Sequence, residues 1–149
     1  MPTRAKIKIN DVPELRTILD TIYDSKTQIQ LAQWALGLAE HILALVEYDY
    51  KNDLAIQNGF TVNKMWQANA ARMFDVRQAG FKVHQQAKAC DDQVVQAALR
   101  VAGQAVGTGH MREHAMVASD YAIKTINLKY PSDMDAVIAE RERQINSLR

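Results

Sequence analysis

The sequence predicts an all-α fold, a single-domain helical bundle of about five to seven helices. The chain has 149 residues, 48% of them hydrophobic, which is enough for one domain with a buried core. Almost every segment after residue 10 carries apolar residues at spacings of three and four, the period of an α-helix. Only Arg4 to Ile9 alternates like a strand, and no second strand is available to pair with it.

The first ten residues are expected to form a flexible basic N-terminal arm, and residues 11–149 a single all-helical domain. The domain opens at Asp11-Val-Pro-Glu14, which offers an Asp cap, a proline in the first turn and a glutamate at the capping-box position. This motif predicts a helix from Asp11 to about Asp24.

The motif Ser25-Lys-Thr-Gln28 repeats the capping device and predicts a second helix that ends near Glu47. One face of this helix collects most of its large apolar residues: Leu31, Trp34, Ala35, Leu38, Ile42 and Leu45, widened by Leu36 and Leu43. We interpret it as the central core helix. Gln33, Glu40 and His41 make the segment too polar for a membrane span, so no membrane association is expected.

The polar stretch 48–61 predicts a short helix and a turn at Asn58-Gly59, after which Thr61 or Asn63 caps the next helix. From there a long inward-facing seam follows helical spacing, and only Asn69 interrupts it. Its members are Val62, Trp66, Met73, Val76, Gly80, Val83, Ala87 and Cys90.

Asp91-Asp92 supplies the next N-terminal cap, and an alanine-rich helical pattern continues to about Leu128. Whether this helix continues through the glycines of residues 107–109 or breaks there is open. Pro131 ends the run, and Ser132 to Asp135 form a capping box for a last helix to about Leu148. Met134, Ile138, Ile145 and Leu148 are expected inside and the ERER run at 140–143 outside.

Charge and cysteine content limit the function classes. Lys plus Arg total 18 and Asp plus Glu 17, so no broad field attracts nucleic acid. The single cysteine, Cys90, excludes an intramolecular disulfide framework and fits a reducing compartment, so a cytoplasmic location is expected. The neighbouring Asp91 and Asp92 disfavour a reactive thiolate, and we interpret Cys90 as a core residue.

One helix carries basic and aromatic residues together, which raises a small-ligand or nucleic-acid binding module as a second alternative function. These residues are Arg72, Arg77, Lys82 and Lys88 with Trp66, Phe74 and Phe81. We interpret the aromatic side chains as pointing largely inward and the charges as a solvated helix side. Nucleic acid is therefore an unlikely partner.

The stretch GQAVGTGHMREH, residues 103–114, is the most unusual in the chain. On a continuous helix, Gly103, Gly107, His110 and His114 share one stripe. Three helical glycines cost about 3 kcal/mol relative to alanines, which indicates close packing of another helix against Gly103 and Gly107.

The same stretch reads H-x-x-E-H, a zinc motif of one metallopeptidase class, so a metal-dependent hydrolase using His110, Glu113 and His114 is the first alternative function. His84 is the candidate third metal ligand. The only later glutamates, Glu140 and Glu142, lie in the charged ERER run. We therefore favour histidines that hydrogen-bond in a polar patch, with no resident metal and no other cofactor.

The segment 97–128 resembles the immunity-five-like family, helical immunity proteins of bacterial polymorphic toxin systems. The matching residues are Arg100, Gly103, Ala105, His110, His114, Tyr121 and Ala122, and the upstream stretch RQAGFKVHQQAKAC, with His84, is similar to the family's preceding helix. The resemblance covers residues 62–128 well and the flanks loosely. Glu113 departs from it, because relatives often carry a small residue at that position.

The resemblance implies an all-α, non-catalytic cytoplasmic protein that binds and neutralises a protein toxin. It attaches no enzymatic activity and no catalytic residue to the chain. The candidate binding or polar-patch residues are His84, Arg100, His110, Glu113, His114 and Tyr121. An exposed part of the glycine stripe would also serve a dimer, so a homo-oligomer stays open.

Overall fold

The computed structural model describes residues 2–149, and over these residues it contains seven α-helices, one short 3₁₀ helix and no strand. The predicted all-α, single-domain fold is confirmed. In chain order the elements are α1 (Pro13–Asp24), α2 (Gln28–Leu45), η1 (Tyr50–Asn52), α3 (Leu54–Gln67), α4 (Met73–Lys88), α5 (Gln93–Gly107), α6 (His114–Lys129) and α7 (Met134–Leu148).

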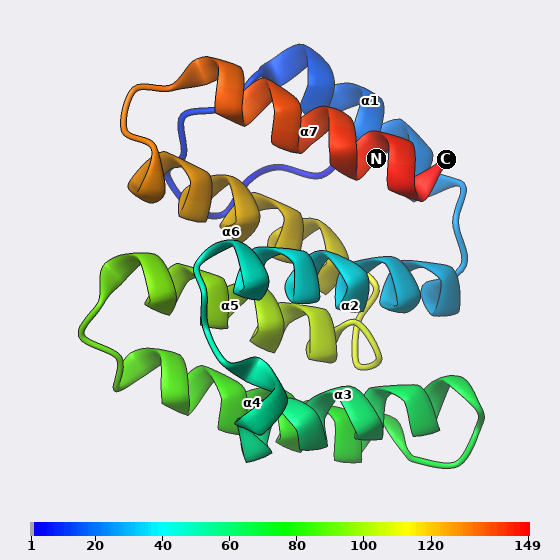
Figure 1. Cartoon of the computed structure of the whole chain (residues 1–149). Helices are drawn as coiled ribbons and strands as arrows, with labels where there is room; N and C mark the ends of the chain where they lie inside the picture. The colour runs from blue at the N-terminus through cyan, green and yellow to red at the C-terminus, as the bar shows by residue number, and fades with distance from the viewer. Residues whose placement is uncertain (1) are drawn as a thin grey trace.

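The helices form three layers, with α1 and α7 side by side on one side, α2, α5 and α6 in the middle, and α3 and α4 on the other side (Figure 1). Helix α5 lies at the centre and packs against α2, α3, α4 and α6. Its buried residues are mostly alanine, glycine and valine, so neighbouring backbones approach it closely. No helix within residues 2–149 combines the length and the apolarity that a bilayer crossing needs.

One predicted helix cap is confirmed, and others differ from the structure because of local hydrogen bonding. Asp92 caps α5 as predicted, and its carboxylate accepts the N–H groups of Val94 and Val95. Helix α2 is instead capped by Thr27, whose hydroxyl accepts the Gln30 N–H while the Gln30 side chain accepts the Thr27 N–H. The Ser25 cap was wrong, because a full capping box is available two residues later.

Asp11 does not cap α1. The N-cap residue is Val12, which forms no side-chain cap, and the carboxylate of Asp11 instead accepts hydrogen bonds from Arg141. At α7 the N-cap is Asp133, which accepts the Ala136 N–H, and the preceding Ser132 has a positive φ of 61°. The predicted capping box at residues 132–135 was therefore one residue early.

The long seam from residue 62 is divided between α3 and α4. Asp53 caps α3, so the helix already begins at Leu54 and passes through Asn58-Gly59 without a turn. A Cβ on Gly59 would lie 2.9 Å from Val106, which shows that this glycine serves close packing of α3 on α5.

Asn69, the residue that interrupts the seam, ends α3. It adopts a φ of 61°, and the following Ala70 N–H donates to the Met65 carbonyl at 2.7 Å. A left-handed Asn at a helix C-terminus is a common terminator, because asparagine tolerates this conformation.

The glycines at 107–109 break the helix, which settles the alternative left open by the sequence. Gly109 lies in the break, where a Cβ would meet Val76 at 2.8 Å. The last carbonyls are satisfied by other helices: Asn63 donates to Val106, and Gln28 donates to Thr108, each at 2.9 Å. The break is therefore stabilised by tertiary contacts and not by turn residues alone.

Residues 2–12 lie along the bundle; the first ten residues were predicted to form a flexible basic arm. The Thr3 N–H and hydroxyl donate to Asp20, and the Arg16 guanidinium donates to the Thr3 carbonyl. Further along, Asn10 and Asn127 exchange two hydrogen bonds. These contacts hold the segment against α1 and α6.

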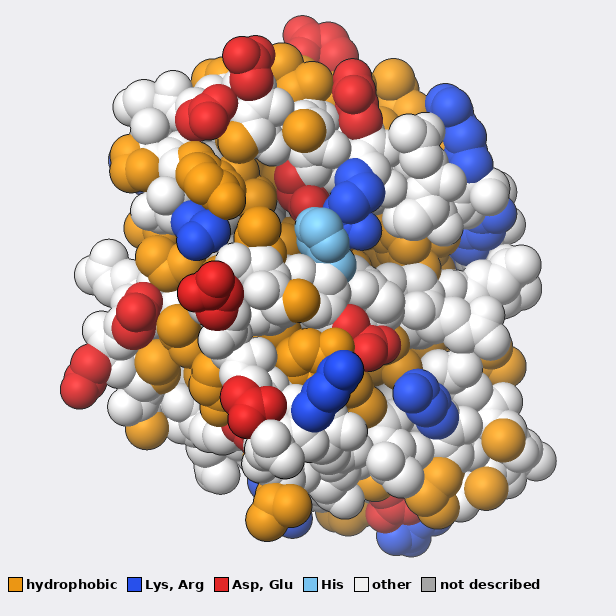
Figure 2. All heavy atoms as spheres, in the orientation of Figure 1, with side chains coloured by type: hydrophobic (Ala, Val, Ile, Leu, Met, Phe, Trp, Pro, Cys, Tyr) orange, Lys and Arg blue, Asp and Glu red, His pale blue; other side chains and the backbone are white. Residues whose placement is uncertain are grey.

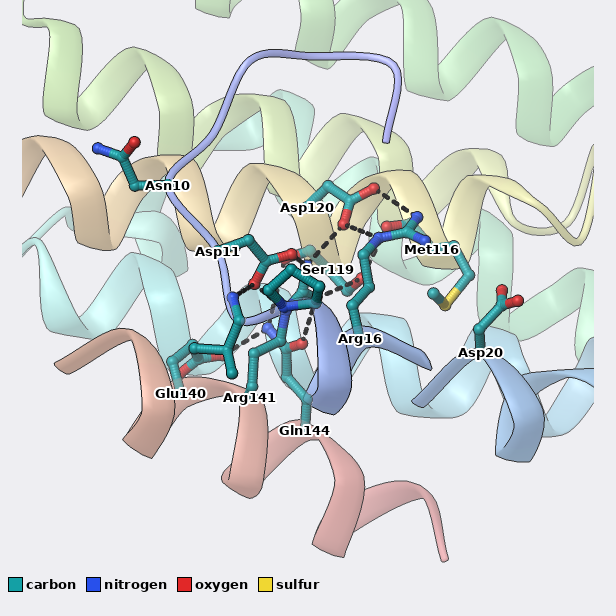
Figure 3. Close-up of polar contacts among 12 residues, drawn as sticks. Asn10, Asp11, Arg16, Asp20, Met116, Ser119, Asp120, Glu140, Arg141 and Gln144 are labelled. Atoms are coloured by element: carbon teal, nitrogen blue, oxygen red, sulfur yellow. Dashed lines mark hydrogen bonds and ion pairs between the residues drawn. The ribbon is translucent and has the colours of Figure 1, made fainter. Parts of the chain in front are cut away.

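A buried polar cluster joins the α1–α7 layer to α6 (Figure 3). Arg141 is fully buried, and each of its five N–H groups has an acceptor within 3.2 Å. The acceptors are Asp11, Asp120, Ser119 and Gln144. A second guanidinium, that of Arg16, binds both oxygens of Asp120 at 2.9 Å. Two cations thus neutralise two carboxylates inside the protein.

This cluster corrects the outward assignment of the ERER run. Glu140 is 4% exposed and Arg141 is 0% exposed. Arg141 shares one helical stripe with Val137, Ile145 and Leu148, at spacings of four, four and three, so it must face the core. Met134 was wrongly expected inside and is 40% exposed.

Candidate functional site

The glycine and histidine residues singled out by the sequence meet around one open pocket of about 310 Å³. The pocket lies where α4, the end of α5 and the turn leading to α6 come together. It is lined by Arg77, Gly80, Phe81, His84, Gly103, Gly107, His110, Met111 and His114.

Three glycines line the pocket at positions where a Cβ would contact a neighbouring side chain or backbone. A Cβ on Gly103 would lie 2.5 Å from the His84 ring, and one on Gly107 would lie 3.3 Å from the His114 ring. On α4, a Cβ on Gly80 would meet the Gly103 carbonyl at 3.4 Å. Gly80 and Gly103 therefore lie where the backbones of α4 and α5 pack close together.

A row of polar groups fixes two of the histidine rings. Arg100 Nη1 lies 3.2 Å from His84 Nδ1, and the Gln104 amide nitrogen lies 3.5 Å from His84 Nε2. On its other side, the Gln104 amide oxygen lies 2.6 Å from His114 Nδ1. Gln104 thus lies between two histidines that the antiparallel arrangement of α4 and α5 alone does not bring into contact, and its amide oxygen holds His114.

Both of these histidines are neutral near pH 7. Burial lowers the pKa of His84 to about 4, and the charges of Arg100 and His114 act in the same direction. Burial also lowers the pKa of His114, helped by His110 and Lys6 and opposed by Glu113. Because a guanidinium can only donate, His84 Nδ1 accepts from Arg100 and the ring hydrogen lies on Nε2. The Gln104 amide nitrogen is also a donor, so it forms no hydrogen bond with Nε2 in this arrangement.

The H-x-x-E-H interpretation does not fit the fold. Helix α6 begins at His114, and His110 lies in the preceding turn, so the two residues do not share a helical face. Their ring centroids are 5.9 Å apart. Glu113 is the N-cap residue of α6 and does not line the pocket. Within residues 2–149, no group of three His, Cys, Asp or Glu side chains is placed to hold a metal ion.

The aromatic side chains of α4 point outward, contrary to the sequence interpretation. Phe74 is 54% exposed and Phe81 is 46% exposed. The Arg72 and Arg77 guanidinium groups lie over these two rings, 5.8 and 5.1 Å from the ring centroids. A cation over an aromatic face is attracted to it, which explains how the rings are tolerated at the surface.

A second depression adjoins the pocket and shares Phe81 and His84 with it. It is lined by Gln78, Phe81, Lys82, His84, Gln85, Lys88 and Arg100. We refer to the residues that line these two depressions as the α4–α5 groove. Arg77, Lys82, Lys88 and Arg100 contribute four cations to the α4–α5 groove, and among its described lining residues there is no carboxylate.

The remaining candidates lie apart from the pocket. Tyr121 lines a separate depression together with Gln93, Lys124 and Leu128, and Arg100 lies between this depression and the α4–α5 groove. Cys90 is half-buried at the end of α4, with its thiol 3.6 Å from the Asp92 carbonyl.

Sequence reasoning missed Gln104, Met111 and the outward stripe of α4. The signal for the stripe was present: Phe74, Arg77, Phe81, His84 and Lys88 follow spacings of three and four. This stripe differs from the buried one, Val76, Ala79, Gly80, Val83 and Ala87, which packs toward the core. The aromatic residues were assigned to the core by residue type, although the helical period separates them from it.

The charges on one face of the molecule are mixed. Figure 2 shows one face of the molecule, on which basic and acidic side chains are interspersed with hydrophobic ones and no field of one sign forms. This agrees with the formal net charge of +1.

Residues 21–149 match the model of a family described as Imm-5 like putative immunity protein. The match extends on both sides beyond the segment 62–128 in which the sequence resemblance is strongest. Searches of curated proteins and of solved structures found no match to this chain.

Proposed function

Because the chain belongs to the Imm-5 like family of immunity proteins, we propose that it is a cytoplasmic, non-catalytic antitoxin that neutralises a protein toxin by direct binding. The family match over residues 21–149 is the observation that carries this proposal. An inhibitor of this kind acts by covering the toxin's active site or its substrate path, so it needs a stable body and an exposed recognition surface.

The structure offers such a surface beside a well-packed core. Four large hydrophobic side chains are between 44% and 54% exposed on α4 and on the turn before α6: Met73, Phe74, Phe81 and Met111. Aromatic residues, methionine and arginine are enriched in protein–protein interfaces. These features support a binding role.

Co-expression with candidate toxins encoded beside its gene tests the proposal. A host that makes the toxin alone should stop growing, and a host that makes both proteins should grow. Directing the toxin to the cytosol or to the periplasm tests the compartment. An inactive toxin serves as the control for expression burden.

Purified proteins give the second readout. We expect the toxin and this protein to elute together from a sizing column, and light scattering then gives the stoichiometry and the oligomeric state of the free protein. Absence of protection by a folded, accumulated protein, together with separate elution of the two chains, would exclude the proposal.

A further inference from the structure

Resting on the proposed function, we propose that the toxin is bound in the α4–α5 groove, through an acidic segment of the toxin that places an apolar side chain in the pocket. The α4–α5 groove combines a hydrophobic centre with cations on its borders, and these two features specify the partner's chemistry.

The centre of the α4–α5 groove fits an apolar side chain. The pocket of about 310 Å³ has glycines in its floor and Phe81 and Met111 among its lining residues. Its volume is at the lower end of the range for small-ligand sites, about 300 to 1,000 Å³, and it is open to solvent. A side chain that protrudes from a partner surface can therefore enter it without a conformational change in the backbone.

Two histidine rings that line the pocket are held by polar partners and carry no charge near pH 7. His84 is held by Arg100, and His114 is held by Gln104. Because both rings are neutral near pH 7, covering them does not require burial of a charge. A preformed site loses little conformational entropy on binding, which favours affinity.

The borders of the α4–α5 groove are positive. Arg77, Lys82 and Lys88 are exposed along α4, and Arg100 faces them from α5. Asp75, the acidic residue of α4, is paired with Arg72 at 3.1 Å. Carboxylates on a toxin would meet unpaired cations here, which steers association and fixes orientation.

The observations favour an acidic protein surface over nucleic acid. A nucleic-acid site needs many phosphate contacts, and the summed charge of +1 supplies no field that extends beyond the α4–α5 groove. The arginine beside the pocket already covers an aromatic ring, because Arg77 lies 5.1 Å from the Phe81 centroid. That arrangement leaves a hydrophobic recess and not a free stacking platform.

Binding of the cognate toxin to full-length variants tests the proposal. The charge variant is Arg77→Glu/Lys88→Glu, and the pocket variant is Phe81→Ser; all three side chains are exposed, so the fold should persist. The matched control is Lys51→Glu/Lys129→Glu, which makes the same charge change at two exposed positions outside the α4–α5 groove. Circular dichroism and thermal melting verify that each variant is folded, and calorimetry measures Kd.

We expect Kd to rise at least ten-fold for each α4–α5 groove variant and less than three-fold for the control. The Kd of the parent protein should also rise with salt concentration. The Kd of the charge variant should rise less over the same range of salt. If the parent binds toxin and all variants bind equally, the groove assignment is wrong while the antitoxin function stands. If the parent protein binds no toxin, both the groove assignment and the antitoxin function are excluded. Salt-sensitive binding of a single-stranded oligonucleotide, lost in the charge variant, would instead assign the α4–α5 groove to nucleic acid.

Discussion

Replacing Arg141 by methionine tests how the polar cluster holds the α1–α7 layer. Methionine keeps most of the side-chain length but removes five N–H donors and one positive charge. Asp120 retains Arg16, whereas Asp11 loses the guanidinium that binds both of its oxygens. The substitution therefore leaves an unpaired carboxylate in a mostly buried position.

The expected cost is large because the partner is not replaced. Removing one member of a buried ion pair costs about 3 to 5 kcal/mol. For a chain of 149 residues, an unfolding entropy of about 2.1 cal/mol/K per residue converts this cost into a Tm decrease of roughly 10 to 15 °C. The double variant Arg141→Met/Asp11→Leu should recover part of the loss, because a neutral Arg16–Asp120 pair then remains.

Calorimetry and urea unfolding measure these changes, and pH gives an independent signature. Burial acts to raise the pKa of Asp11, but the hydrogen bonds and charge of Arg141 bring it below the ordinary 3.8. In the parent this contribution is present above pH 3.8 and is lost as the pH falls through the lower folded pKa. In the Arg141→Met variant, burial acts without Arg141, so the pKa of Asp11 rises. The difference in the free energy of unfolding between parent and variant should therefore become smaller as the pH falls from 7 toward 4.

The matched control is Arg72→Met, which removes an arginine from an aspartate pair on the surface. Arg72 is 78% exposed, so its loss should leave the Tm nearly unchanged. A Tm for Arg141→Met within about 3 °C of the control, or a stability gap that does not change with pH, would refute the reasoning.

Three further predictions address the glycines, His84 and a cap. Gly103→Ala should destabilise the protein by about 1 to 3 kcal/mol, because the new Cβ would meet the His84 ring. Gly37→Ala should stabilise it by about 0.5 to 1 kcal/mol, because no atom lies within 4 Å of the new Cβ. Urea unfolding measures both changes, and a change in the free energy of unfolding of the same sign for both variants would contradict this prediction. His84 has a pKa of about 4 in the folded protein and an ordinary pKa of 6.5 in the unfolded chain, so the unfolded chain binds a proton first as the pH falls. The free energy of unfolding should therefore decrease between pH 7 and pH 5, and His84→Gln should flatten this pH dependence. An unchanged pH dependence would exclude His84 as its source. Asp92→Ala should cost about 0.5 to 2 kcal/mol in the same assay, and a neutral result would show that its cap hydrogen bonds are replaced by water.

The sequence predicted the helical fold but not where helices break. Helical periodicity and the Asp92 cap are local properties, so they are readable residue by residue. The break after Gly107 depends on side chains from α2 and α3 that satisfy its carbonyls. The division of the seam depends on one residue, Asn69, whose left-handed conformation becomes clear only in the folded chain.

The structure brings some of the candidate site residues together and leaves others apart: Arg100, Glu113 and Tyr121 do not line the pocket. Gly103, Gly107, His84, His110 and His114 do meet, although two of the histidines were predicted on one helix and lie in a turn and at a helix start. The hydrogen bond between Gln104 and His114 is a tertiary contact that spacing cannot reveal. The outward aromatic stripe and the buried arginine were missed for a common reason: residue type was given more weight than helical position.

Titration of toxin activity with the purified protein tests the central claim most directly. The account predicts that activity falls to its background value near one equivalent of the parent and of the Lys51→Glu/Lys129→Glu control, whereas Arg77→Glu/Lys88→Glu requires at least a ten-fold excess. Undiminished toxin activity at a large excess of the folded parent protein would contradict it.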